Sequence, residues 1–151
     1  IKAVQRVYGN IDGYITIVNS FFMIDYRKIK NLNARMECGC NPGIITLHKS
    51  QQVKNADNTG DDNPVVCNAW IDYWKTFTME DIPDVCPLCG EPMTDDDSKG
   101  CHVLIKSQSV MGNGNYGTTK YIIPGHHKCN CQFGEEFELK IEIKAVEAIK
   151  K

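Results

Sequence analysis

The stretch Cys86-Pro87-Leu88-Cys89-Gly90 decides what kind of fold this chain can adopt. Its spacing is that of a zinc knuckle, in which two cysteine sulfurs on a tight turn face one point and a small following residue lets backbone amides approach them. Redox-active cysteine pairs share the spacing, but they open a helix within a β-α-β unit. Here Pro92 and the run Asp95-Asp96-Asp97 follow, which disfavours a helix. We therefore interpret the stretch as a zinc knuckle, with a redox pair or disulfide as the alternative.

A structural zinc site needs four ligands, so two more must come from another part of the chain. The other dense group of thiols and imidazoles lies at residues 126–131, and within it His126 and Cys129 repeat the knuckle spacing. The predicted zinc ligands are Cys86, Cys89, His126 and Cys129. His127 and Cys131 form a reserve pair. The alternative is that Cys129 and Cys131 are simply small buried hydrophobic residues.

The other cysteines of the eight in the chain match no knuckle pattern. A bond between Cys38 and Cys40, which are separated by one glycine, would be strained, so both are expected to be free thiols. A second metal site that joins them to Cys67 and His48 is an alternative, although Cys67 is better explained as a core residue. Free thiols fit a reducing, cytoplasmic compartment better than secretion, and we therefore expect an intracellular protein.

Composition and charge exclude some classes of protein. The chain has 151 residues, of which 42% are hydrophobic, and this suffices for one packed domain. It has no apolar run of 18 residues and no signal-peptide pattern, so we expect neither a membrane span nor secretion.

Charge is distributed unevenly along the sequence. Residues 1–54 carry eight Lys or Arg and three acids, residues 55–100 carry two Lys and eleven acids, and residues 101–151 carry seven Lys and five acids. Arg27, Lys28 and Lys30 form a candidate phosphate-contacting strip in the basic first third, with a solvated helix or strand face as the alternative.

Hydrophobic patterning predicts mixed secondary structure. β-branched and aromatic residues favour strands at 14–18, 21–24, 44–47, 102–106 and 121–124. Apolar residues at helical spacing predict a helix from residue 66 to 77, and this apolar stripe is expected to face the core. Strict alternation at residues 137–143 predicts one amphipathic C-terminal strand.

In this order, the motifs of the second half resemble the zinc-containing branch of the HNH endonucleases, the treble-clef or ββα-metal group. The segments that carry the resemblance are Cys86-x-x-Cys89-Gly90, Gly100–Ile105 and Tyr121–Asn130, within residues 84–133. In that family a knuckle precedes a strand that ends near a catalytic histidine, and a second segment enters a short helix. The resemblance places His126 and Cys129 at the third and fourth zinc positions.

The resemblance also implies catalytic positions, although two of these positions are altered. His102 falls on the general-base position and Asn130 on a metal-binding position. In the family a neutral histidine removes a proton from water, and a divalent ion such as Mg²⁺ or Mn²⁺ neutralises charge on the phosphate. Cys101 replaces the usual Asp or His, and a thiolate is a poor Mg²⁺ ligand. Tyr121 replaces the orienting Asn. Alternatively, His102 is a packed core residue and Asn130 a helix cap.

These observations predict an α+β fold with a strand-rich N-terminal portion and one helix at residues 1–80. A treble-clef-like zinc module with a C-terminal strand follows at residues 81–151, although one compact domain is an alternative. The expected function is zinc-stabilised, HNH-like binding of DNA or RNA, either without catalysis or as a metal-dependent endonuclease. The alternative is a protein-interaction module that uses the acidic surface of residues 55–100.

Overall fold

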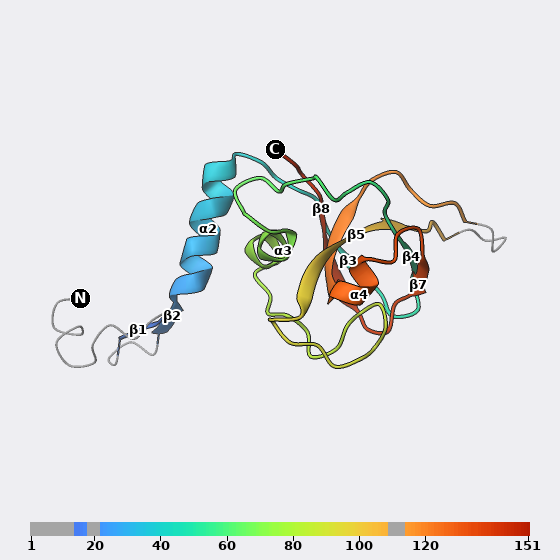
Figure 1. Ribbon diagram of the computed structural model, residues 1–151. Helices are drawn as coiled ribbons and strands as arrows, with labels where there is room; N and C mark the ends of the chain where they lie inside the picture. Colours follow the sequence, from blue (N-terminus) through green and yellow to red (C-terminus); the bar gives the residue numbers. More distant parts are fainter. Residues whose placement is uncertain (1–13, 18–21, 109–113) are drawn as a thin grey trace.

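The computed structural model describes residues 14–17, 22–108 and 114–151, and the fold is mixed α/β (Figure 1). The elements are β1 (Tyr14–Ile17), β2 (Phe22–Asp25), α2 (Tyr26–Cys38), β3 (Ile44–Leu47), β4 (Gln52–Asn55), α3 (Trp70–Thr78), β5 (Ser98–Ile105), β6 (Tyr121–His126), α4 (His127–Asn130), β7 (Glu136–Glu138) and β8 (Ile143–Glu147). None of the helices in these ranges is long and apolar enough to cross a bilayer.

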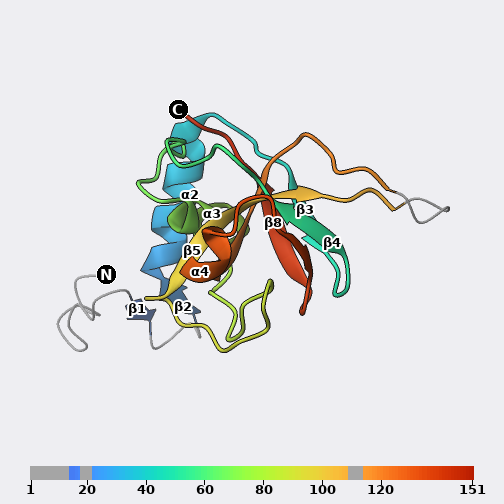
Figure 2. The ribbon, with the colours of Figure 1, turned by 45° about the vertical axis from the view of Figure 1, so that its right-hand side comes forward.

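Six strands form one antiparallel sheet in the order β3-β8-β6-β5-β4-β7, which curves like half of a barrel (Figure 2). β5 and β6 form its longest hairpin, in which Ser98 pairs with His126 and Val103 with Tyr121. β1 and β2 form a separate antiparallel pair. β3 and β4 belong to the same sheet as four strands from the second half of the chain. The expected boundary near residue 80 therefore does not separate two sheets.

The expected helix is α3, and its stripe packs in the core as predicted. It begins at Trp70 rather than at residue 66 because Val66 has a left-handed φ of 53° and the Cys67 N–H donates to the Val65 carbonyl, which makes a tight turn. Tyr73 and Trp74 are fully buried. Their polar atoms fix α3 to the sheet, since the Tyr73 hydroxyl donates to the Glu147 carbonyl and Trp74 Nε1 donates to the Lys144 carbonyl.

A second long helix, α2, was not predicted. Its apolar residues have helical spacing but remain exposed, with 38% of Ile29, 47% of Leu32 and 74% of Met36 accessible. A core-facing apolar stripe, the usual signal for a helix, is therefore weak in this segment. The basic strip at residues 27–30 lies in the first turns of α2, and the positions of its charged side chains are outside the described residues.

The prediction of one strand at residues 137–143 was wrong. β7 pairs with β4 at one edge of the sheet, whereas β8 lies between β3 and β6. Between them, buried Leu139 exchanges backbone hydrogen bonds with the 50–51 turn, and the Lys140 N–H donates to the Pro87 carbonyl. The alternation continues through this crossing, so the sequence pattern does not reveal the break.

Candidate metal centre

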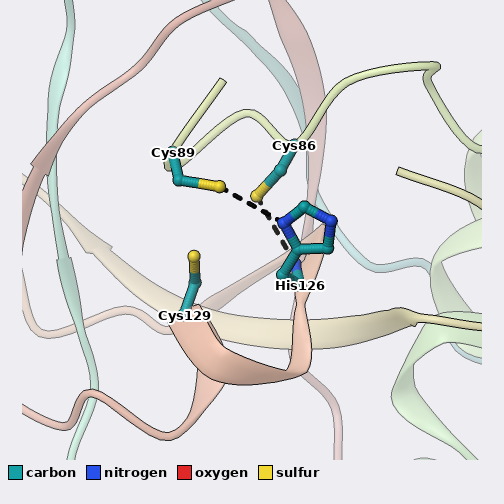
Figure 3. Close-up of side chains that lie close together, drawn as sticks. All are labelled: Cys86, Cys89, His126 and Cys129. Carbon is teal, nitrogen blue, oxygen red and sulfur yellow. Dashed lines mark hydrogen bonds between the residues drawn. The ribbon is translucent and has the colours of Figure 1, made fainter. Parts of the chain in front are cut away.

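The structure brings Cys86, Cys89, His126 and Cys129 together (Figure 3). Their ligand atoms all lie within 4.8 Å of one another. Tetrahedral zinc with Zn–S bonds near 2.3 Å separates its sulfur ligands by about 3.8 Å, so small side-chain adjustments would close the shell. Three thiols and one imidazole form a donor set that suits zinc. The group could therefore hold a metal ion.

The first half of the group is a tight turn that backbone hydrogen bonds hold in place. The Cys86 N–H donates to the Glu91 carbonyl and the Gly90 N–H donates to the Cys86 carbonyl, each at 2.8 Å. Gly90 has a φ of 79°, which a residue with a Cβ rarely adopts. This backbone requirement explains the glycine directly after the second cysteine.

The second half comes from the junction between β6 and α4. His126 is the last residue of β6, and Cys129 lies in the single turn of α4. His126 Nε2 lies 2.9 Å from the Pro92 carbonyl, which can only accept, so the proton resides on Nε2. Nδ1 faces the Cys89 sulfur at 3.2 Å: it donates to the Cys89 thiolate when the imidazole is protonated, and it has a free lone pair for a metal ion when the imidazole is neutral. The imidazole is thus oriented for metal binding by an outer hydrogen bond.

Two thiols of the group, those of Cys89 and Cys129, have perturbed pKa values. Burial and the neighbouring charge of Cys86 raise the pKa of Cys129 to about 12. For Cys89, burial raises the pKa, but hydrogen bonds from the Glu91 backbone and from His126 outweigh it and lower the pKa to about 7. A divalent cation would neutralise the Cys129 thiolate, which this pocket otherwise disfavours, so the residues fit a zinc ion.

Asn55 supports the second half of the group, and sequence reasoning missed it. Its side chain is 2% exposed, and Nδ2 lies 2.9 to 3.1 Å from the carbonyl oxygens of Cys129, Asn130 and Gln132. The two N–H groups of this buried amide are shared among three backbone acceptors, and they fix the turn that carries the fourth ligand. Its position in a polar, loop-like stretch gave no signal of this role.

Cys101 lies directly behind the group but outside it. A Cβ on Gly125 would lie 2.8 Å from the Cys101 sulfur and 3.8 Å from the Cys86 sulfur, so the glycine allows these thiols to pack closely. Burial, with the charges of Cys86 and Cys129, raises the pKa of Cys101 well above its usual value. Cys101 is therefore a neutral packed thiol.

His102 faces the opposite side of β5, because successive strand residues alternate between faces. It is 4% exposed, and its ring meets that of Trp70 edge-on at 4.6 Å. Its Nε2 has no hydrogen-bond partner in the described part of the chain. Figure 1 shows α3, which begins at Trp70, and α4 to either side of β5. His102 is thus a packed core histidine outside the metal-binding group.

Asn130 is the last residue of α4, and its carbonyl accepts the Asn55 amide. Within the described ranges, the four-residue group is the only cluster of three or more His, Cys, Asp or Glu that could hold a metal. The structure therefore unites the predicted zinc ligands but does not unite His102 and Asn130 with a second metal group for Mg²⁺ or Mn²⁺.

The buried state of His102 predicts a specific pH dependence. Burial lowers its pKa from 6.5 to about 4. Between these values the unfolded chain binds more protons than the fold, so His102 should cost up to about 3 kcal/mol of stability as pH falls from 6.5 to 4. His102→Phe should lose less stability than the wild type over this window, as measured by urea unfolding at pH 7, 6 and 5. Zinc content measured at each pH serves as the control, and parallel profiles would contradict the prediction.

The cysteines outside the group differ from expectation at one point. Cys38 and Cys40 form a disulfide, so the expectation of two free thiols was wrong. Gly39 has a left-handed φ of 59°, which brings the two Cα atoms to 5.1 Å, within the usual disulfide range. Cys67 lies half-buried against the core as predicted. His48 is exposed and contacts Glu142, so these residues form no second metal group.

The reserve pair also behaves differently from the four ligands. Cys131 is exposed, and its sulfur lies near the ring of His127 on the outer side of α4.

Comparison with known proteins finds no family model, no curated protein and no solved structure that matches this chain.

Proposed function

We propose that this chain is a zinc-stabilised module of the treble-clef, HNH-like type that binds DNA or RNA without cleaving it. The observation that carries the proposal is the order in which the ligands arise: a knuckle, then the β5–β6 hairpin, then the turn of α4. A treble clef has this order of elements. A bound zinc ion would hold the knuckle, the hairpin and α4 together.

Charge supports nucleic acid as the partner. Residues 98–134 form the β5–β6 hairpin and α4, and they contain four lysines and no Asp or Glu. Lys99 and Lys106 have no carboxylate partner among the described residues, and the Lys106 ammonium group lies 5.7 Å from the Tyr116 ring centre. Lysines without a carboxylate partner, one of which is hydrogen-bonded to Gln52 and lies near an aromatic ring, suit contact with phosphates and bases.

The position of His102 supports binding without cleavage. A general base must reach a water molecule or the substrate, and this imidazole is packed beneath Trp70. Cys101 projects from the opposite face of the same strand. A buried thiol offers no oxygen or imidazole donor for the catalytic metal ion that an active nuclease needs.

The acidic residues of segment 55–100 support binding to a basic protein partner less than their number implies. Lysines neutralise several of its acids: Lys75 contacts Asp95, Lys128 contacts Glu91, Lys144 contacts Glu80, and Lys150 contacts Asp62. Three of these four lysines come from the C-terminal third of the chain, so folding reduces the charge asymmetry. A protein-interaction module remains the second candidate.

The proposal predicts salt-sensitive binding that depends on particular lysines. Fluorescence anisotropy with labelled single- and double-stranded DNA and RNA should show affinity that falls steeply as salt rises. Lys99→Gln with Lys106→Gln should weaken binding and reduce the salt slope by about one to two. Lys75→Gln with Lys144→Gln is the matched control, because these lysines are already paired with Asp95 and Glu80. Absence of binding at low salt would instead favour the protein-interaction module.

Cleavage is tested separately on supercoiled plasmid with Mg²⁺ or Mn²⁺. We expect no nicking above the background of the His102→Phe variant. Metal-dependent nicking by the wild type that this variant loses while it keeps its zinc would establish an active nuclease and overturn the non-catalytic proposal.

A further inference from the structure

A second pair of metal-binding side chains lies beside the four-residue group and is not used by it. His127 and Cys131 are both exposed and are separated by one helical turn. The Cys131 sulfur lies 3.6 Å from His127 Nε2. The Cys131 N–H donates to the His127 carbonyl at 3.0 Å, which fixes the turn that presents both side chains.

This distance matches the geometry of a zinc site. With Zn–S near 2.3 Å and Zn–N near 2.05 Å, a tetrahedral ion separates its sulfur and nitrogen ligands by about 3.6 Å. Histidine pairs at the same i, i+4 spacing on a helix are an established way to grip zinc from one face. The two side chains therefore already have the separation that a shared ion requires.

We propose that His127 and Cys131 are half of a second zinc site, which two copies of this chain complete together. One copy supplies two ligands, whereas a stable zinc site takes four. A two-fold axis through the ion would bring the same pair from a second copy and give two cysteines and two histidines.

The surroundings of the pair suit such an interface. Phe133, two residues beyond Cys131, is 57% exposed, and a second copy would cover it. Lys128 lies between the two ligands in sequence and would oppose the approach of a second copy, but it is paired with Glu91. The proposal is independent of nucleic-acid binding.

The test is a zinc titration of the full chain in a phosphine reductant, which prevents Cys131 from forming an intermolecular disulfide. Sedimentation and zinc analysis should show a monomer with one zinc at the first equivalent. Excess zinc should give a dimer with three ions per pair of chains, and a chelator that removes only the weaker site should restore the monomer. Cobalt titration should add thiolate-to-metal absorbance beyond the first equivalent.

Cys131→Ser and His127→Ala should keep the first zinc ion and remain monomeric in excess zinc. Both residues are exposed, so neither variant should lose its fold. His48→Ala, which removes another exposed histidine, is the matched control and should dimerise like the wild type. A wild type that stays monomeric in excess zinc, a monomer that holds the second ion alone, or variants that dimerise equally would each overturn the proposal.

Discussion

Replacement of Cys86 and Cys89 by serine is expected to abolish zinc binding and to unfold most of the chain. Both knuckle ligands are lost, and apparent binding free energies of structural zinc in small domains are about 10–16 kcal/mol. Because typical domains are stable by only about 5–15 kcal/mol, the loss should remove most of the free energy of unfolding. Circular dichroism and zinc analysis of the purified protein measure the two effects, and a strong chelator should reproduce them in the wild type.

The four-residue group that could hold a metal ion is part of the core, so the loss of its ligands should also destabilise the packing around it. Cys86 and Cys129 are buried in the same hydrophobic cluster as Trp74 of α3 and Val146 of β8. Acid should have the same effect as a chelator, because zinc binding requires deprotonated thiols and a neutral imidazole.

Cys67→Ser is the control for this prediction, since it removes a half-buried thiol that belongs to no metal group. It should retain zinc and lose little stability. A Cys86→Ser, Cys89→Ser protein that retains both zinc and its fold would refute the metal centre.

Asn55→Asp is expected to have the second-largest effect. The substitution replaces the amide, which donates to three carbonyl oxygens, with a carboxylate that can only accept. The carbonyl oxygens then lose their donor and lie next to a buried negative charge. We expect a loss of about 3–5 kcal/mol in the free energy of unfolding, and about 2–3 kcal/mol for Asn55→Ala, which only removes the donors. Urea unfolding of the zinc-loaded protein measures both.

The same substitutions should weaken zinc binding, because the carbonyls that Asn55 holds include that of the ligand Cys129. A competition titration with a chromophoric chelator measures this affinity. Asn63→Asp is the matched control, since Asn63 is exposed and should change stability by less than about 0.5 kcal/mol. Equal effects at both positions would mean that Asn55 has no special role.

Local sequence determined the features that depend on neighbouring residues. The knuckle at residues 86–90 could be identified because its hydrogen bonds and the φ of Gly90 are internal to the turn. The pairing of His126 with Cys129 followed from the same spacing. Strands β3 and β6 followed from their β-branched and aromatic composition, and α3 followed from apolar residues at helical spacing.

Tertiary structure decided the features that depend on distant partners. Asn55 became a support for the ligands only because β4 lies against the α4 turn, and no local pattern distinguishes it from a loop asparagine. The alternation at residues 137–143 conceals a crossing from β7 at one edge of the sheet to β8 between β3 and β6, since both flanking segments keep the same periodicity. The sequence likewise did not determine whether His102 is buried in the core or accessible as a general base.

The sequence by itself therefore determined which residues can bind metal and which short segments are regular. It did so because thiol spacing and side-chain periodicity are properties of adjacent residues. Only the folded chain decided what these two neighbours on β5 contact: Cys101 lies beside the thiols, and His102 lies beneath Trp70. Burial and electrostatic environment come from packing between segments far apart in sequence, and these determine whether a histidine can act as a base or only fill the core.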